Sequence, residues 1–98
     1  MRFIWDEYKN RRNRSKHNVS FETAVLVFDD PHAISIQDRF VQGEERWQTL
    51  GLIEGVIVML VAHSVEVEGD EEPIRIISAR KATPREREIY AQSQQKTK

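Results

Sequence analysis

Basic side chains are concentrated in two short stretches of the chain. The segment "KNRRNRSKH", residues 9–17, carries five lysines or arginines and no acid, and "ARKATPRERE", residues 79–88, carries four against two glutamates. In the second stretch, Arg80 and Lys81 end an apolar strand directly before a helix starts. The free N–H groups at such a helix start favour a bound anion, so this pair is a candidate phosphate clamp. The alternatives are that the charges are only solvated or that Arg80 pairs with a carboxylate such as Glu45.

The remaining chemistry-bearing residues indicate which reaction could use these cations. The chain has no glycine-rich phosphate loop, no closely spaced pair of histidines and no cysteine. Its arginines, lysines, histidines and glutamates suit metal-free cleavage of RNA, in which a base accepts the 2′-hydroxyl proton and cations stabilise the phosphate charge. We therefore expect no cofactor and no metal site. The residues expected to act in catalysis are Arg80, His63, Glu45 and Arg46.

Several of these assignments have structural alternatives. His63 lies on an apolar strand, where a histidine is more often structural than catalytic. Glu45 and Arg46 are neighbours on a strand and should point to opposite faces. His17 could cap the carbonyl end of its helix instead of touching RNA. The residues expected to contact RNA are Lys16, His17, Arg12, Arg75, Lys81 and Arg85.

Length and composition restrict the class of protein. The 98 residues suit one small domain covering residues 1–98, with a frayed polar tail from about residue 92. The longest apolar run, "VIVMLVA", is too short to cross a bilayer, and the first residues lack the apolar core of a signal peptide. These features favour a cytoplasmic protein without membrane contact. The net charge is only −1, yet acids gather at residues 29–30 and 66–72, which predicts one basic and one acidic surface.

Capping residues predict three helices. Asp6 should cap a basic helix that ends near Asn18, and Ser20 should cap an amphipathic helix over residues 21–30. Thr83 and Glu86, with Pro84 between them, form a capping box that starts the last helix.

Alternating apolar residues predict the strands, at residues 2–5, 33–38, 43–53, 56–65 and 73–80. The fourth of these is apolar on both faces and should be the central strand. The expected order β-α-α-β-β-β-β-α describes a small α+β domain, a mainly antiparallel meander with helices packed on one face. On the last strand, alternation separates Arg75 from Arg80 unless a bulge intervenes.

The blocks "WDEYKNRRNRSKHNVSFETAVLVFDD", "GEERWQTLGLI" and "IRIISARKATPREREIY" together resemble the BrnT toxins of type II toxin–antitoxin systems. The resemblance covers residues 5 to about 90. Asn18 stands where the family usually has glycine, and Glu7 where it often has proline. Both exchanges keep the local capping pattern.

The resemblance implies a RelE-like fold and an endoribonuclease that inhibits translation. It also implies a BrnA-type antitoxin as partner, whose ribbon-helix-helix part binds the operon DNA, so that the toxin meets DNA only through the antitoxin. The alternative functions are a non-catalytic module that only grips nucleic acid and an interaction protein that only holds a partner.

Overall fold

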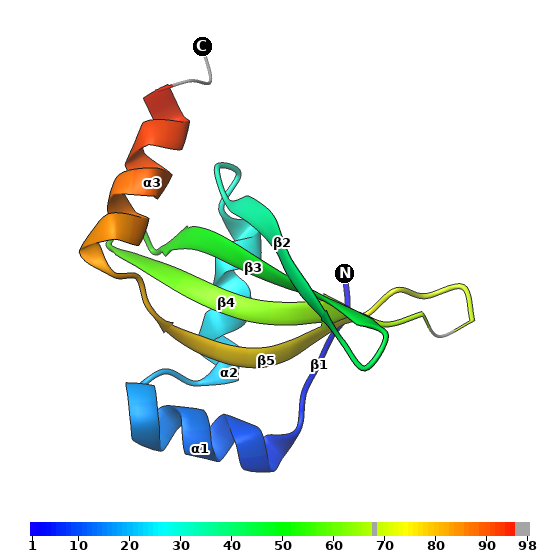
Figure 1. Cartoon of the computed structure of the whole chain (residues 1–98). Helices are drawn as coiled ribbons and strands as arrows, with labels where there is room; N and C mark the ends of the chain where they lie inside the picture. Colours follow the sequence, from blue (N-terminus) through cyan, green and yellow to red (C-terminus); the bar gives the residue numbers. More distant parts are fainter. Residues whose placement is uncertain (68, 96–98) are drawn as a thin grey trace.

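The computed structural model describes residues 1–67 and 69–95. Within these residues the elements follow the predicted order, and a 3-10 helix, η1, extends the second helix (Figure 1). In chain order they are β1 (Phe3–Ile4), α1 (Glu7–His17), α2 (Phe21–Ala24), η1 (Val25–Asp29), β2 (Ile34–Val41), β3 (Glu44–Ile53), β4 (Ile57–Val65), β5 (Ile74–Lys81) and α3 (Pro84–Gln95).

The predicted helix caps are present. The carboxylate of Asp6 accepts the Tyr8 N–H at 3.0 Å, and Asn18 ends α1 in the left-handed conformation with φ 59°. The Ser20 hydroxyl accepts the Thr23 N–H at 3.1 Å. At α3, Glu86 donates its N–H to the Thr83 hydroxyl and accepts the Thr83 N–H in return. Residues 92–95 of the segment predicted as a polar tail belong to α3, and residues 96–98 lie outside the described part.

The prediction of one helix over residues 21–30 is wrong in detail, because the α-helix gives way to η1 after Ala24. The β-branched side chains of Val25 and Val27 lose rotamer freedom in an α-helix, which weakens it here. Packing also favours the tighter turn. A Cβ added to Gly51 on β3 would lie 2.7 Å from the Val27 Cβ, so the glycine lets η1 lie directly on the sheet.

The sheet order is β1-β5-β4-β3-β2, so β4 is the central strand as predicted. Its neighbours β3 and β5 run antiparallel to it, and β1 pairs parallel with the start of β5. No helix in the described residues is long and apolar enough to cross a membrane.

Helices cover both faces of the sheet, which corrects the prediction of one covered face. We call the two faces the α2 face and the α3 face. On the α2 face, Phe21 and Val27 pack against Val61 of β4. On the α3 face, Tyr90 packs with Leu60, the neighbour of Val61, in a smaller cluster. The single-face prediction failed because β3 and β4 present apolar side chains alternately to both sides.

A bulge in β5 overturns the predicted separation of the two arginines. The register places Ser78 opposite Ala62 but Ile76 opposite His63, so Ile77 is an extra residue. Beyond the bulge the alternation changes phase, and Ala79 joins Ile76 in the core on the α2 face. Arg75 and Arg80 therefore both lie on the α3 face.

Candidate nucleic-acid interface

Helix α1 lies alongside β5 and covers much of its open edge (Figure 1). β1 pairs with Ile74 and Arg75, and no other strand in the described residues pairs with the later part of β5 on that side. The buried side chain of Asn13 takes the place of a strand. Its amide donates to the Ala79 carbonyl at 2.8 Å and accepts the Ala79 N–H at 3.1 Å. This paired contact fixes the position of α1 beside the sheet.

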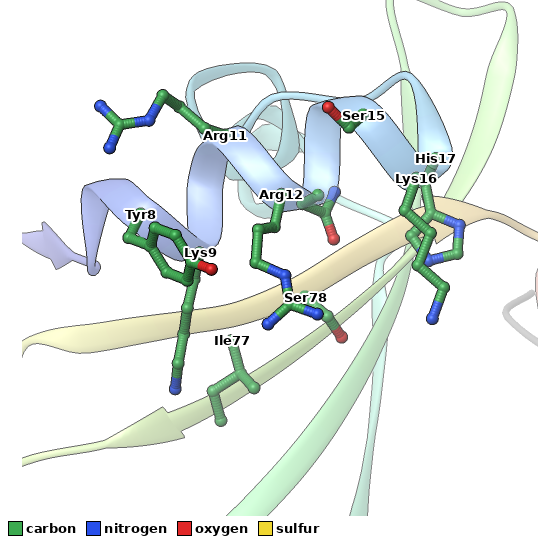
Figure 2. A pocket seen from close by; sticks show the side chains of 10 residues that line it. Tyr8, Lys9, Arg11, Arg12, Ser15, Lys16, His17, Ile77 and Ser78 are labelled. Carbon is green, nitrogen blue, oxygen red and sulfur yellow. The ribbon is translucent and has the colours of Figure 1, made fainter.

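Between α1 and the bulged part of β5 lies a hollow of about 670 Å³ (Figure 2). Among the described residues, its lining contains four lysines or arginines, one histidine and no acid. The lining residues are Tyr8, Lys9, Arg11, Arg12, Asn13, Ser15, Lys16, His17, Ile77 and Ser78.

A second hollow, of about 540 Å³, continues past the end of α1 toward the start of α3. It shares Ser15, Lys16 and His17 with the first hollow, and no acid is present among the described residues that line it. Its other lining residues are Asn18, Arg80, Lys81, Ala82 and Thr83. We call the two adjoining hollows the basic groove.

The cations of α1 are arranged along one side of the helix. Lys9, Arg12 and Lys16 are three and four residues apart and point toward β5, whereas Arg11 points away (Figure 2). The Arg12 guanidinium lies 5.8 Å from the centre of the Tyr8 ring. Among the described residues, no carboxylate forms an ion pair with these cations or with Lys81. Their charges therefore remain available for an anionic ligand.

Arg80 combines a groove position with an ion pair. Its guanidinium donates to both carboxylate oxygens of Glu86, at 2.7 and 2.9 Å, and also to the Lys81 carbonyl. The hydrogen bond from Arg80 is the main reason that the pKa of Glu86 falls to about 2. The predicted alternative of an ion pair is thus present, but its partner is Glu86 and not Glu45. Because arginine has five N–H donors and three are engaged, two remain for a phosphate.

The other predicted site residues on strands and α3 do not line the groove. Arg46 pairs with Glu44 at 3.2 Å and Arg75 pairs with Glu66, both on the α3 face. Arg85 is exposed on α3, 3.9 Å from Glu88. Glu45 accepts a hydrogen bond from Gln37 on the edge strand β2. The structure therefore brings together Arg12, Lys16, His17, Arg80 and Lys81 in the groove. The predicted residues Glu45, Arg46, Arg75 and Arg85 lie outside it.

His63 lies in the core, which favours its structural alternative. The side chain is 5% exposed, its Nε2 lies 2.7 Å from the Thr49 hydroxyl, and its ring packs edge-on against Phe28. Burial lowers the pKa of His63 to about 4, so the ring is neutral at pH 7. A buried ring on the α2 face has no contact with the groove.

The predictions did not include several residues of the groove. Lys9 could have been found from its spacing to Arg12 and Lys16 on a predicted helix. Ser78 could not, because only the bulge turns it toward α1. Within the described residues, no group of three histidine, aspartate or glutamate side chains is placed to hold a metal ion.

Comparisons with known proteins give a consistent result. A family model described as "Ribonuclease toxin, BrnT, of type II toxin-antitoxin system" matches residues 5–86. Among solved structures, the chain is similar to the crystal structure of the Brucella abortus ribonuclease toxin BrnT, with 26% sequence identity and a TM-score of 0.66. That match covers 85% of this chain and 97% of the other. No curated protein sequence matches the chain.

Proposed function

Because the chain belongs to the BrnT family of ribonuclease toxins of type II toxin–antitoxin systems, we propose that it binds and cleaves RNA in the basic groove. The observation that carries the proposal is the charge of the groove. In the part of the chain that the structure describes, six lysines or arginines and no acid line it, although the net charge of the chain is −1. Such a segregated positive surface suits the phosphate backbone of RNA.

The groove also suits the chemistry of cleavage without a metal ion. The 2′-oxygen attacks the neighbouring phosphorus, and negative charge develops on the phosphate oxygens. Arg80 and Lys81, held at the end of β5, can stabilise that charge. Lys9, Arg12 and Lys16 can hold the flanking phosphates along α1, and Tyr8 offers a ring on which a base can stack.

The test is incubation of the purified protein with end-labelled RNA in excess chelator. Cleavage should persist and leave a 2′,3′-cyclic phosphate or a 3′-phosphate on one fragment and a 5′-hydroxyl on the other. A single 2′-deoxynucleotide at the cut site should block that cut. Loss of cleavage in chelator with recovery in Mg²⁺ would overturn the metal-free mechanism. Binding without any cleavage would favour the alternative of a non-catalytic nucleic-acid-binding module.

Membership of the family supports a proposal for the cellular role. We propose that the protein acts in the cytoplasm and inhibits translation by cutting RNA. Addition of the protein to a cell-free translation reaction should stop synthesis and fragment the messenger RNA, and a variant with the groove cations neutralised should do neither. Inhibition by that variant at the wild-type level would contradict this role.

We also propose a BrnA-type antitoxin as the partner, with a ribbon-helix-helix part that binds operon DNA. An acidic or mixed segment of the antitoxin should cover the basic groove, because the free cations there would attract carboxylates. The antitoxin should then block cleavage and protect α1 from hydrogen exchange. Binding of the antitoxin without any effect on cleavage would rule out occlusion of the groove.

A further inference from the structure

We propose that His17 is the general base that accepts the 2′-hydroxyl proton during cleavage. This inference rests on the proposed function of the basic groove and adds a role for one of its residues. His17 is the last residue of α1 and lines both hollows, so it lies where they join. Figure 2 shows its ring beside Lys16 at the end of α1.

The first argument is that the imidazole is not committed to a structural role. The side chain is partly exposed, and it forms no hydrogen bond or ion pair with any described residue. The predicted alternative, capping of the helix carbonyls by His17, is not observed. The Asn18 N–H bonds to the Arg14 carbonyl at 2.9 Å and closes the end of α1 instead.

The second argument comes from the other groups around His17. The groove presents Lys16 from α1, Arg80 and Lys81 from β5, and the Thr83 hydroxyl before α3. No carboxylate of residues 1–67 or 69–95 lines either hollow. Histidine is the one side chain type among the lining residues that ordinarily exchanges its proton near neutral pH. Lysine, arginine and tyrosine hold their protons too strongly to serve as bases there.

The third argument is that Glu86, the carboxylate bonded to the groove residues Arg80 and Thr83, is committed elsewhere. Glu86 lies beyond the groove lining, and both of its oxygens accept hydrogen bonds from Arg80 while one also accepts the Thr83 N–H. A carboxylate with a pKa of about 2 is a poor proton acceptor at neutral pH. His63 is buried on the α2 face, and His32 lies in the loop before β2.

The proposed step balances as follows. The 2′-oxygen forms a bond to phosphorus, the bond from phosphorus to the 5′-oxygen breaks, and the 2′-hydroxyl proton passes to the His17 ring. The departing 5′-oxygen takes a proton from water. The products are a 2′,3′-cyclic phosphate and a 5′-hydroxyl, and His17 returns its proton to solvent.

The experiment compares the wild-type protein with His17→Ala and His32→Ala, the second being an exposed histidine outside the groove. Single-turnover cleavage of an RNA oligonucleotide should fall at least about a hundredfold in His17→Ala and stay near the wild-type rate in His32→Ala. The affinity for a 2′-O-methyl oligonucleotide of the same sequence, which cannot be cut, should change little. Added imidazole should restore part of the lost rate in His17→Ala only.

The outcomes separate this proposal from the function on which it rests. If wild-type protein cuts RNA and His17→Ala cuts at the same rate, the assignment of His17 is wrong and the ribonuclease function stands. If His17→Ala loses affinity and rate in parallel and imidazole restores nothing, His17 only binds RNA and the assignment is again wrong. If the wild-type protein binds RNA but never cuts it, the proposed function itself fails.

Discussion

At the scale of single residues, Arg80 has two roles that a substitution can separate. It lines the groove, and it neutralises Glu86 in the capping box of α3. Arg80→Ala should lower the cleavage rate per folded molecule about a hundredfold, which corresponds to roughly 3 kcal/mol of transition-state stabilisation. Arg80→Lys should recover only part of that rate, because its ammonium keeps the positive charge but lacks the bidentate fork of arginine. Both variants should be assayed by RNA cleavage and by thermal unfolding.

The matched control for Arg80 is Glu86→Gln, which breaks the same ion pair and keeps the guanidinium. Its thermal midpoint should fall as in Arg80→Ala, whereas its cleavage rate should fall much less. Equal losses of rate in the two variants would mean that the ion pair, and not a phosphate contact, explains the effect of Arg80.

The buried histidine predicts a pH dependence of stability. The pKa of His63 is about 4 in the folded protein, below the ordinary value near 6.5 expected in the unfolded chain. Between these values the unfolded state binds the extra proton, so stability should fall as the pH falls from 6.5 toward 4. The expected loss by pH 4.5 is about 2 kcal/mol, measured by denaturant unfolding.

Only the upper part of the pH range in which His63 changes the stability is free of the effect of the lowered carboxyl groups. Burial opposes ionisation of Asp30, but hydrogen bonds from Tyr90 and from backbone N–H groups outweigh it and lower the pKa of Asp30. The pKa of Glu86 is lowered as well. The stabilising effect of both groups is present above their ordinary carboxyl pKa values and is lost as the pH falls through those values toward the lowered ones. His63→Gln should therefore flatten the stability profile between about pH 6.5 and 5.5, where the histidine dominates, and an unchanged slope would contradict the assignment.

At the scale of elements, α1 depends on two buried asparagines. Asn10 links the helix to the Phe21 N–H and to Glu22, and Asn13 links it to Ala79 and to the Val19 carbonyl. The helix has almost no apolar face, so these hydrogen bonds replace the usual hydrophobic contact. The position of the groove cations therefore depends on amide side chains in the middle of a helix.

Asn13→Ala should leave the N–H and C=O of Ala79 without their partner. The expected loss of unfolding free energy is about 3 kcal/mol, because unpaired buried backbone groups are costly. Hydrogen exchange at the Ala79 amide should accelerate even under stable conditions. Ser15→Ala, an exposed change on the same helix, should alter neither quantity. Unchanged exchange at Ala79 in Asn13→Ala would show that α1 is held in another way.

The sequence patterns predicted the secondary-structure elements more accurately than they predicted the contacts between those elements. The capping residues Asp6, Ser20 and Thr83 act locally, so the helix starts could be read directly from the sequence. The Ile77 bulge leaves no local signal, because its cause is the register with β4. The same holds for Asn13, whose partners lie 66 residues away at Ala79. Several basic residues of the groove could be predicted from the sequence. The way in which α1 and β5 bring them together could not, because it depends on the bulge and on the Asn13 contact.

At the scale of the whole molecule, charge is separated along the sheet. The described residues of the loop between β4 and β5 lie at one end of the sheet, and the end of α1 lies near the other (Figure 1). The described residues that line the groove include no acid, which agrees with the charge segregation predicted from the sequence. A nearly neutral protein can thus present a strong local field to RNA while keeping its total charge near zero.

This field predicts a specific salt dependence of RNA binding. Each phosphate neutralised on a single strand contributes about −0.7 to the slope of log affinity against log salt concentration. The double variant Lys9→Gln/Lys16→Gln should therefore bind a 2′-O-methyl oligonucleotide with a slope shallower by about 1.4 than the wild type. Arg39→Gln removes an exposed charge on β2, outside the groove, and should leave the slope unchanged. If instead the double variant keeps the wild-type slope, RNA lies elsewhere, and the paired arginines Arg46 and Arg75 on the α3 face become the next surface to neutralise.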